Sequence, residues 1–361
     1  MEVDHKEKAA CMNAGCSAVS WETMDGKHLW GRNFDFNRLA KGTNVFFIPA
    51  KTPYQICPEE EPTGKGDRER KTIYGIIGIG VSLSLDCPIF YEGMNEEGLM
   101  GGQLYYREFA DFSRETNEER TPVAPPLLVT YLLATCGDVG EVAREMKENI
   151  QLAMQPIFGS VPPLHWMFTD KQGRSIVIES RKEGLFLYED AMGVLTNSPG
   201  YDWHCTNLLN YMHIRDEDYG KRVINSHVLN PCFSGSGALG LPGDCSSPSR
   251  FVRLAFLKEY MQKGRNEEEG VVGLFHMMGH VSFPAGLVKV GQIGEITEIE
   301  EGLVPYDYTV YTAVMCAESL SFYWTTYENQ QIRCVDMRTL LQDRRKREFP
   351  LKEKAEFCRL S

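Results

Sequence analysis

Cys16 is the residue of this sequence best placed to act as a nucleophile. It opens a predicted strand, and Arg32 and Asp35 lie at the far end of a second predicted strand that returns after the turn residues Asp25 and Gly26. An antiparallel return brings Arg32 and Asp35 back beside Cys16. A cation there lowers the pKa of the thiol, and a carboxylate orients a neighbouring amine. The spacing predicts a reactive thiol, and it leaves open the alternative of a buried core cysteine beside a surface ion pair.

The other cysteines show no disulfide or metal pattern. The chain has 11 cysteines, an odd number, and none of them forms a CxxC pair. A disulfide framework or a zinc ribbon would show regular spacing. We therefore interpret most of these thiols as buried and inert, and we expect the protein to work in a reducing cytoplasm.

The charge balance argues against a nucleic-acid or membrane partner. The 361 residues are 42% hydrophobic and carry a formal net charge of −12, whereas binding to a phosphate backbone needs a clustered basic face. The basic run 344–347 is flanked by Asp343 and Glu348, so we interpret it as a solvated helix face or tail. No apolar run approaches the roughly 20 residues of a membrane span, and residues 1–15 lack the apolar core of a secretory signal.

Strands and helices are predicted in blocks. Strand patterns occur at 16–22, 28–34, 44–50, 73–83, 164–170, 175–180, 184–190, 193–197, 308–316, 320–327 and 331–337. Helices are predicted after Pro125-Pro126, from Asp138, from Ser247-Pro248 and over 266–280. The polar stretch 57–72 is interpreted as a surface loop. Because the blocks do not alternate as single βα units, the pattern favours an α+β protein whose sheets are covered by helix layers.

Neither a cofactor nor a metal is predicted. The glycines at 75, 78 and 80 do not form the dinucleotide fingerprint, and no helix start follows them. His276 and His280 stand at i and i+4, which places both on one helix face. The glutamate of an HExxH motif is absent, however, and no third ligand is evident.

Five separated segments resemble the choloylglycine hydrolases, the family of bile salt hydrolases and penicillin V acylases. They are CSAVSWETMDGKHLWGRNFDF from residue 16, GMNEEGLMGGQLYY (93–106), GVLTNSPGYDWHCTNLLNY (193–211), GLPGDCSSPSRFVRLAF (240–256) and FYWTTYENQQIRCVDM (322–337). The resemblance covers residues 16–337 in order. It implies a single domain with the four-layer αββα sandwich of N-terminal-nucleophile hydrolases, followed by a charged tail at 338–361.

The resemblance also implies a catalytic set. In chain order it comprises the nucleophile Cys16, the active-site residues Arg32 and Asp35, the oxyanion-hole asparagine Asn197 and a second arginine, Arg250. Tyr105 falls where bile salt hydrolases usually carry asparagine and penicillin V acylases carry tyrosine. This position favours a penicillin V-like acyl amide as substrate, with conjugated bile acids as the alternative.

Such an enzyme needs Cys16 at its N-terminus. A free α-amine has a pKa of about 7.7–8.0 and can accept a proton at neutral pH, whereas the same nitrogen within a peptide bond cannot. We expect residues 1–15 to be removed, by attack of the thiol on the Gly15 carbonyl; translation from Met12 would leave only four residues to remove. The resemblance implies a small-molecule acyl amide as partner and a homotetramer.

Two other readings remain open at this stage. A papain-like enzyme would pair Cys16 with a histidine, but none of the eight histidines falls in a recognisable catalytic motif. A non-catalytic binding protein on the same fold would not need the complete catalytic set.

Overall fold

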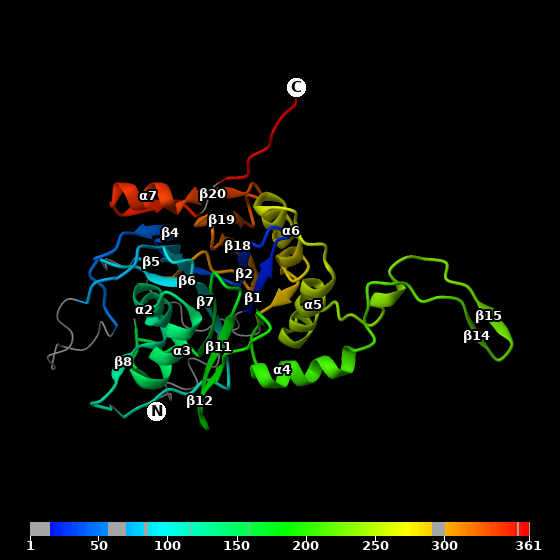
Figure 1. Ribbon diagram of the computed structural model, residues 1–361, viewed down its shortest axis with the longest axis horizontal. Coiled ribbons are helices and arrows are strands. Elements are labelled where there is room, and N and C mark those ends of the chain that lie inside the picture. The colour runs from blue at the N-terminus through cyan, green and yellow to red at the C-terminus, as the bar shows by residue number, and fades with distance from the viewer. Residues whose placement is uncertain are drawn as a thin grey trace.

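Two antiparallel sheets pack face to face in the computed structural model, which describes residues 15–56, 70–82, 86–115, 117–157, 159–290, 300–351 and 354–360 (Figure 1). The first sheet has the order β13 (Val194–Leu195), β1 (Gly15–Glu22), β2 (His28–Phe36), β18 (Tyr306–Cys316), β19 (Ser321–Thr326) and β20 (Arg333–Asp336), with β16 (Val288–Lys289) beside β18. The second has the order β12 (Gly184–Tyr188), β11 (Ser175–Arg181), β10 (Leu164–Thr169), β7 (Met100–Tyr105), β6 (Ile89–Asn95), β5 (Ile76–Val81), β4 (Thr43–Ile48) and β21 (Arg347–Phe349).

Helices cover the outer face of each sheet. The helices α5 (Ser247–Tyr260) and α6 (Glu267–Gly279) pack on the first sheet, and α2 (Leu128–Thr135) and α3 (Val139–Glu148) pack on the second. One apolar core fills the space between the sheets and under α5 and α6, and another lies under α2 and α3. The predicted four-layer αββα sandwich is confirmed.

The hairpin that carries Cys16 forms as predicted. In the β1–β2 register Ala18 is opposite Arg32 and Gly15 is opposite Asp35. Side chains alternate between the two faces of a sheet, so Cys16 and Arg32 share the face that meets the second sheet. Asp35 lies on the other face, towards the helices. The end of β1 therefore places the Gly15–Cys16 peptide bond between groups on both faces.

Several features differ from the sequence predictions, and those that bear on the site and the domain boundary are the following. The strands β6 and β7 and the short helix α4 (Tyr201–Asn207) were not predicted. The domain does not end at residue 337, because α7 (Met337–Asp343) follows and β21 pairs with the edge strand β4. The tail thus completes the second sheet. The predicted loop 57–72 lies mostly, and the leader almost entirely, outside the described residues.

An arm formed by residues 213–245 projects away from the sandwich between α4 and α5 (Figure 1). Its hairpin consists of β14 (Arg222–Ile224) and β15 (His227–Leu229), which pair only with each other among the described strands. Large apolar side chains of the arm are exposed, namely Tyr219, Val223, Ile224, Val228, Leu229, Phe233 and Leu239.

Candidate active site

A cleft of about 340 Å³ opens at the end of β1. Its walls include Gly15, Tyr105, Asn197, Arg250 and Asp307. Cys16 lies directly behind Gly15 and is only 2% exposed. The described structure therefore holds the candidate nucleophile at the base of the cleft with Gly15 still attached to it.

Arg32 lies against the Cys16 thiol. The distance from Arg32 Nη2 to Cys16 Sγ is 3.2 Å. The same guanidinium forms an ion pair with Glu92 of β6, and the Tyr311 hydroxyl donates to the same carboxylate at 3.1 Å. Arg32 and Glu92 are both buried. A residue from the second sheet therefore directs Arg32 towards the sulfur, and no sequence pattern indicated its role.

The thiol is protonated in this arrangement. Burial raises the pKa of Cys16, and this outweighs the opposing effects of the Arg32 charge and of hydrogen bonds from Arg32 and the Asp35 main chain. A cation beside the thiol was predicted to favour the thiolate, but the desolvation of this buried sulfur is the larger effect. A base must therefore take the proton before this sulfur can attack.

Asn197 is the most highly connected residue of the site. Its Oδ1 accepts from the Cys16 main-chain N–H at 2.9 Å and from Arg250 Nη2 at 2.7 Å. Its Nδ2 donates to the Tyr105 carbonyl at 2.8 Å. An amide nitrogen carries two hydrogens, so one N–H of Nδ2 remains beyond the bond to Tyr105. Asn197 fixes the Cys16 nitrogen with one end of its amide and offers a donor with the other.

Arg250 enters the site from α5. Its Nη1 donates to the Cys16 carbonyl at 2.5 Å and to Ser17 Oγ at 2.7 Å. The helix was predicted to start at Ser247-Pro248, with Ser247 as its N-cap. The structure instead places Ser246 at the cap position, and the Ser247 hydroxyl accepts from the Asn197 main-chain N–H at 2.9 Å. The start of α5 therefore holds both Asn197 and the main chain of Cys16.

Asp35 carries a buried carboxylate oxygen to which no described residue donates a hydrogen bond. Its Oδ1 accepts from the Thr309 hydroxyl at 2.5 Å, whereas its buried Oδ2 has no hydrogen-bond partner within the described chain. Burial raises the pKa of Asp35 to about 6, against the lowering effect of Arg250. A Cβ built on Gly15 would lie 3.1 Å from Asp35 Cβ and 2.8 Å from Phe283 Cζ. Asp35 thus lies directly beside the peptide bond that precedes Cys16.

The side chain and the main chain of Tyr105 take separate places in the site. Its ring lies 5.9 Å, centroid to centroid, from the ring of Phe36, on the wall of the cleft. Its main-chain carbonyl is the group that contacts Asn197. The side chain is therefore placed to contact a substrate, and the main chain belongs to the cluster around Cys16.

The structure brings all six predicted site residues together. It also bears on a papain-like Cys–His pair, on a metal site and on a membrane span. Within the described residues the side-chain partner of Cys16 Sγ is Arg32 and not a histidine, contrary to a papain-like pair. The described part of the chain contains no group of three or more His, Cys, Asp or Glu side chains that could hold a metal ion. None of the described helices has the length and apolarity to span a membrane.

Known structures share this architecture. The structure matches a crystal structure of a variant of the conjugated bile acid hydrolase from Clostridium perfringens with a TM-score of 0.83 and 30% identity, covering 96% of this chain and 100% of that one. It also matches the penicillin V acylase from Agrobacterium tumefaciens, with a TM-score of 0.67 and 18% identity over 90% and 87% of the two chains. The fold is that of the N-terminal-nucleophile hydrolases.

The sequence places the chain more narrowly. Residues 16–345 match the family model described as linear amide C–N hydrolases, choloylglycine hydrolase family. Bile salt hydrolase/transferases from Clostridium perfringens and Lactiplantibacillus plantarum are each 34% identical to it, over 89% of this chain and 92% of theirs. The protein belongs to the choloylglycine hydrolase family and is an amidohydrolase that acts on linear amides.

Proposed function

We propose that this protein is a bile salt hydrolase, which cleaves the amide bond between a bile acid and its conjugated amine. The observation that carries the proposal is the identity of 34% to two bile salt hydrolase/transferases over nearly the whole chain. The penicillin V acylase is 18% identical and supports the fold alone. This reverses the order of substrates favoured by Tyr105 in the sequence.

The position of Tyr105 is compatible with this reversal. Its ring lines the cleft, and its main-chain carbonyl accepts a hydrogen bond from Asn197 Nδ2. Exchanging tyrosine for asparagine there alters the shape of the acyl pocket and retains the main-chain carbonyl that contacts Asn197. A single pocket residue therefore weighs less than the relatedness of the whole chain.

Cys16 is the proposed nucleophile, with its own α-amine as the base. The amine takes the thiol proton, and the sulfur attacks the substrate carbonyl. The remaining N–H of Asn197 Nδ2 and a main-chain N–H near Tyr105 bind the oxyanion. The tetrahedral intermediate collapses to a thioester while the α-ammonium protonates the leaving amine. Water, activated by the α-amine, then hydrolyses the thioester and restores the thiol.

Asp35 and Asn197 are placed to hold that amine. The Cys16 nitrogen already contacts Asn197 Oδ1, and Asp35 lies beside Gly15 with one unpartnered carboxylate oxygen. Cleavage of the Gly15–Cys16 bond converts an amide nitrogen with one hydrogen into an ammonium with three. The added charge and donors are met by Asp35, and Arg32, on the opposite face of the sheet, stabilises the negative charge that develops on the Cys16 sulfur.

A substrate panel tests the proposal. Release of glycine from glycocholate, of taurine from taurocholate and of the β-lactam amine from penicillin V is measured side by side, with Cys16→Ser as the inactive control. We expect the bile salts to be turned over with the highest kcat/KM. Faster turnover of penicillin V would restore the acylase reading, and no turnover of any of the three would favour a binding protein or a different N-acyl amide as substrate.

We also propose that copies of the chain associate through the arm, as the homotetramer implied by the resemblance. A two-stranded hairpin is marginally stable alone in water. The arm hairpin nevertheless presents valines, isoleucine and leucine on an exposed surface away from both cores. A second copy of the same arm or of the body would bury these side chains.

A further inference from the structure

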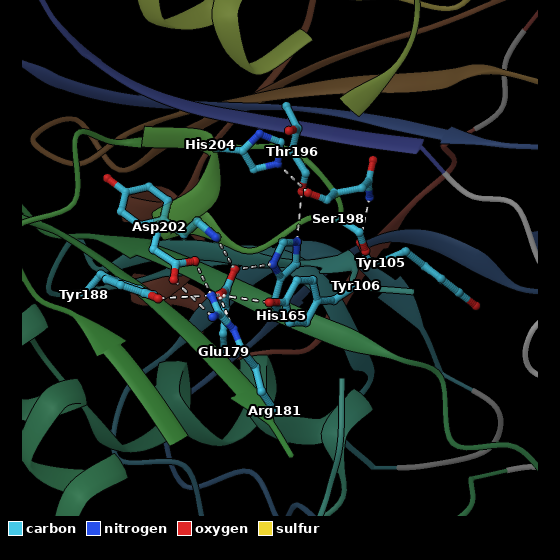
Figure 2. Close-up of polar contacts among 12 residues, drawn as sticks. Tyr105, Tyr106, His165, Glu179, Arg181, Tyr188, Thr196, Ser198, Asp202 and His204 are labelled. Atoms are coloured by element: carbon cyan, nitrogen blue, oxygen red, sulfur yellow. Dashed lines mark hydrogen bonds and ion pairs between the residues drawn. The ribbon is translucent and has the colours of Figure 1, made fainter. Parts of the chain in front are cut away.

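A buried polar cluster lies behind the two segments that carry the proposed oxyanion donors (Figure 2). One segment is the end of β7, at Tyr105 and Tyr106. The other is Thr196 and Asn197, directly after β13. Donors stabilise an oxyanion best when they are already in position before the charge develops. Residues that fix these two segments therefore act on the rate without touching the substrate.

His165 of β10 contacts both segments. Its Nε2 lies 2.9 Å from the Thr196 carbonyl oxygen. Its ring stacks on the ring of Tyr106, with centroids 4.5 Å apart and planes 6° apart. The imidazole is completely buried, and Figure 2 shows it between the two segments. A single side chain thus joins the residue before Asn197 to the residue after Tyr105.

Glu179 of β11 holds His165 from the other side. One oxygen, Oε1, lies 3.2 Å from His165 Nδ1, and the other, Oε2, accepts from the Tyr106 hydroxyl at 3.1 Å. Oε1 also accepts from the Tyr201 main-chain N–H at 3.0 Å. Arg181 pairs with Glu179 and with the partly exposed Asp202. The carboxylate therefore orients the histidine and the tyrosine at once.

The hydrogen bonds determine how many protons His165 carries. The Thr196 carbonyl can only accept, so Nε2 carries a hydrogen. Glu179 forms an ion pair with Arg181 and accepts from the Tyr106 hydroxyl and the Tyr201 main-chain N–H, so its carboxylate is ionised. An ionised carboxylate also only accepts, so Nδ1 carries a hydrogen as well. Both ring nitrogens of this buried histidine thus face groups that accept hydrogen bonds.

A second histidine, His204, holds the main chain of Asn197, and its own ring is neutral. His204 Nε2 lies 2.9 Å from the Asn197 carbonyl oxygen, and its ring stacks on Phe251 with centroids 4.6 Å apart. Burial lowers the pKa of His204 to about 4, so this ring is neutral. The Ser247 hydroxyl accepts from the Asn197 main-chain N–H, and His204 contacts the Asn197 carbonyl. These two contacts fix the main chain on both sides of Asn197.

We propose that His165, as an imidazolium held by Glu179, is a positioning residue for the oxyanion hole. The inference rests on the proposed amide hydrolysis. His165 contacts neither the cleft nor Cys16 in the described structure, and it acts by fixing the Thr196 carbonyl and the Tyr106 ring. The oxyanion forms only in the transition state, so loss of this positioning lowers kcat and leaves KM nearly unchanged.

The kinetic test compares His165→Gln with Tyr131→Phe. The control variant removes a 2.6 Å hydrogen bond to the Glu145 carboxylate in the outer helix layer, remote from the cleft. Steady-state kinetics are measured with glycocholate on protein that is folded by circular dichroism. We expect His165→Gln to lower kcat on the order of 10- to 100-fold with KM within about twofold, and Tyr131→Phe to retain both values.

Two further measurements keep the inference falsifiable. Glu179→Gln, which preserves shape but removes the charge, replaces His165→Gln if the latter does not fold, and the same fall in kcat is expected. Nitrogen-15 NMR of histidine-labelled wild-type protein at pH 7.5, about one unit above the pKa of a free imidazole, reports the protonation of His165 directly. A normal kcat in either folded variant, or a neutral His165 ring, would overturn the inference. If wild-type protein hydrolyses no amide at all, the proposed function fails instead, and the NMR result still decides the state of His165.

Discussion

Arg32 and Glu92 form a buried ion pair that joins the two sheets, and the same guanidinium lies 3.2 Å from Cys16 Sγ. A residue of the opposite sheet thus holds the guanidinium that contacts the proposed nucleophile. Glu92→Gln leaves Arg32 charged and without its ionic partner. Removing one member of a buried pair typically costs about 3–5 kcal/mol. We expect a loss of stability of this order in urea denaturation, accompanied by a lower kcat.

Glu96→Gln serves as the control for that variant. Glu96 follows the same strand and accepts from the Gly75 main-chain N–H at 2.9 Å, away from Cys16. It should retain wild-type kcat. Equal stability of Glu92→Gln and wild type would show that Glu92 is not needed to hold Arg32.

Tyr105→Asn tests whether the side chain or the main chain of Tyr105 matters. The ring packs on Phe36 at the cleft wall, whereas the carbonyl contacts Asn197. We expect turnover of glycocholate to stay within about tenfold of wild type, while the ratio of penicillin V to glycocholate hydrolysis falls. Tyr260→Asn, a half-exposed position on α5, is the control. Complete loss of both activities would place the side chain in the chemistry.

The stability of the leader-bearing protein should depend on Asp307. Burial raises its pKa from 3.8 to about 7, and repulsion from Asp35 adds to this. The pKa of Asp307 is higher in the folded than in the unfolded protein. The contribution of its protonated carboxyl to the stability of the fold is therefore complete below pH 4 and is lost as the pH rises to about 7. Asp307→Asn replaces the titrating carboxyl with a neutral amide, so the variant does not lose this stability as the pH rises. It should stabilise Cys16→Ala protein by about 1–3 kcal/mol at pH 8.

Urea denaturation at pH 5 and pH 8 measures this effect. The gain from Asp307→Asn should be smaller at pH 5, where the carboxyl is mostly protonated. Asp190→Asn, at an exposed position, should show no gain at either pH. A gain that is the same at both pH values would contradict the assigned titration.

The exposed apolar side chains of the arm lead us to expect that copies of the chain associate through it. Val223 and Val228 are opposite each other in the hairpin and are 59% and 50% exposed. We expect Val223→Asp combined with Val228→Asp to dissociate the oligomer, because a buried interface does not tolerate unpaired charges. Met24→Asp, at an exposed turn of the body, should not. Sedimentation equilibrium is the measurement, and an unchanged mass for the double variant would exclude the arm from the interface.

The sequence predicted the local part of the site and missed the part built from distant strands. Cys16, Arg32 and Asp35 lie within one hairpin, where strand alternation and a turn determine which residues meet. Glu92 and His165 reach the site only through the packing of one sheet on the other, and no local pattern encodes that packing.

The missed strands have a physical explanation. Strand β6 contains Gly93, and β7 contains Gly101 and Gly102, which weaken a strand pattern. The structure needs them, because a Cβ at Gly101 would lie 2.2 Å from the Phe168 ring and one at Gly93 would lie 2.7 Å from the Ile77 carbonyl oxygen. Neighbouring strands approach so closely at these positions that glycine is required. In a sequence, by contrast, glycine usually indicates a turn. Strand β21 was missed because its residues are mostly charged and lie at a sheet edge.

The N-terminal residue of the active protein tests the whole account most directly. Intact-mass spectrometry is applied to wild-type protein that turns over an amide substrate, and to Cys16→Ala as the variant that cannot cleave itself. We expect the wild-type mass to correspond to a chain that begins at Cys16, and the variant to retain everything before that position. A fully active wild-type preparation that still carries residues 1–15 would contradict the account, because the Cys16 nitrogen would then be an amide with no capacity to accept a proton.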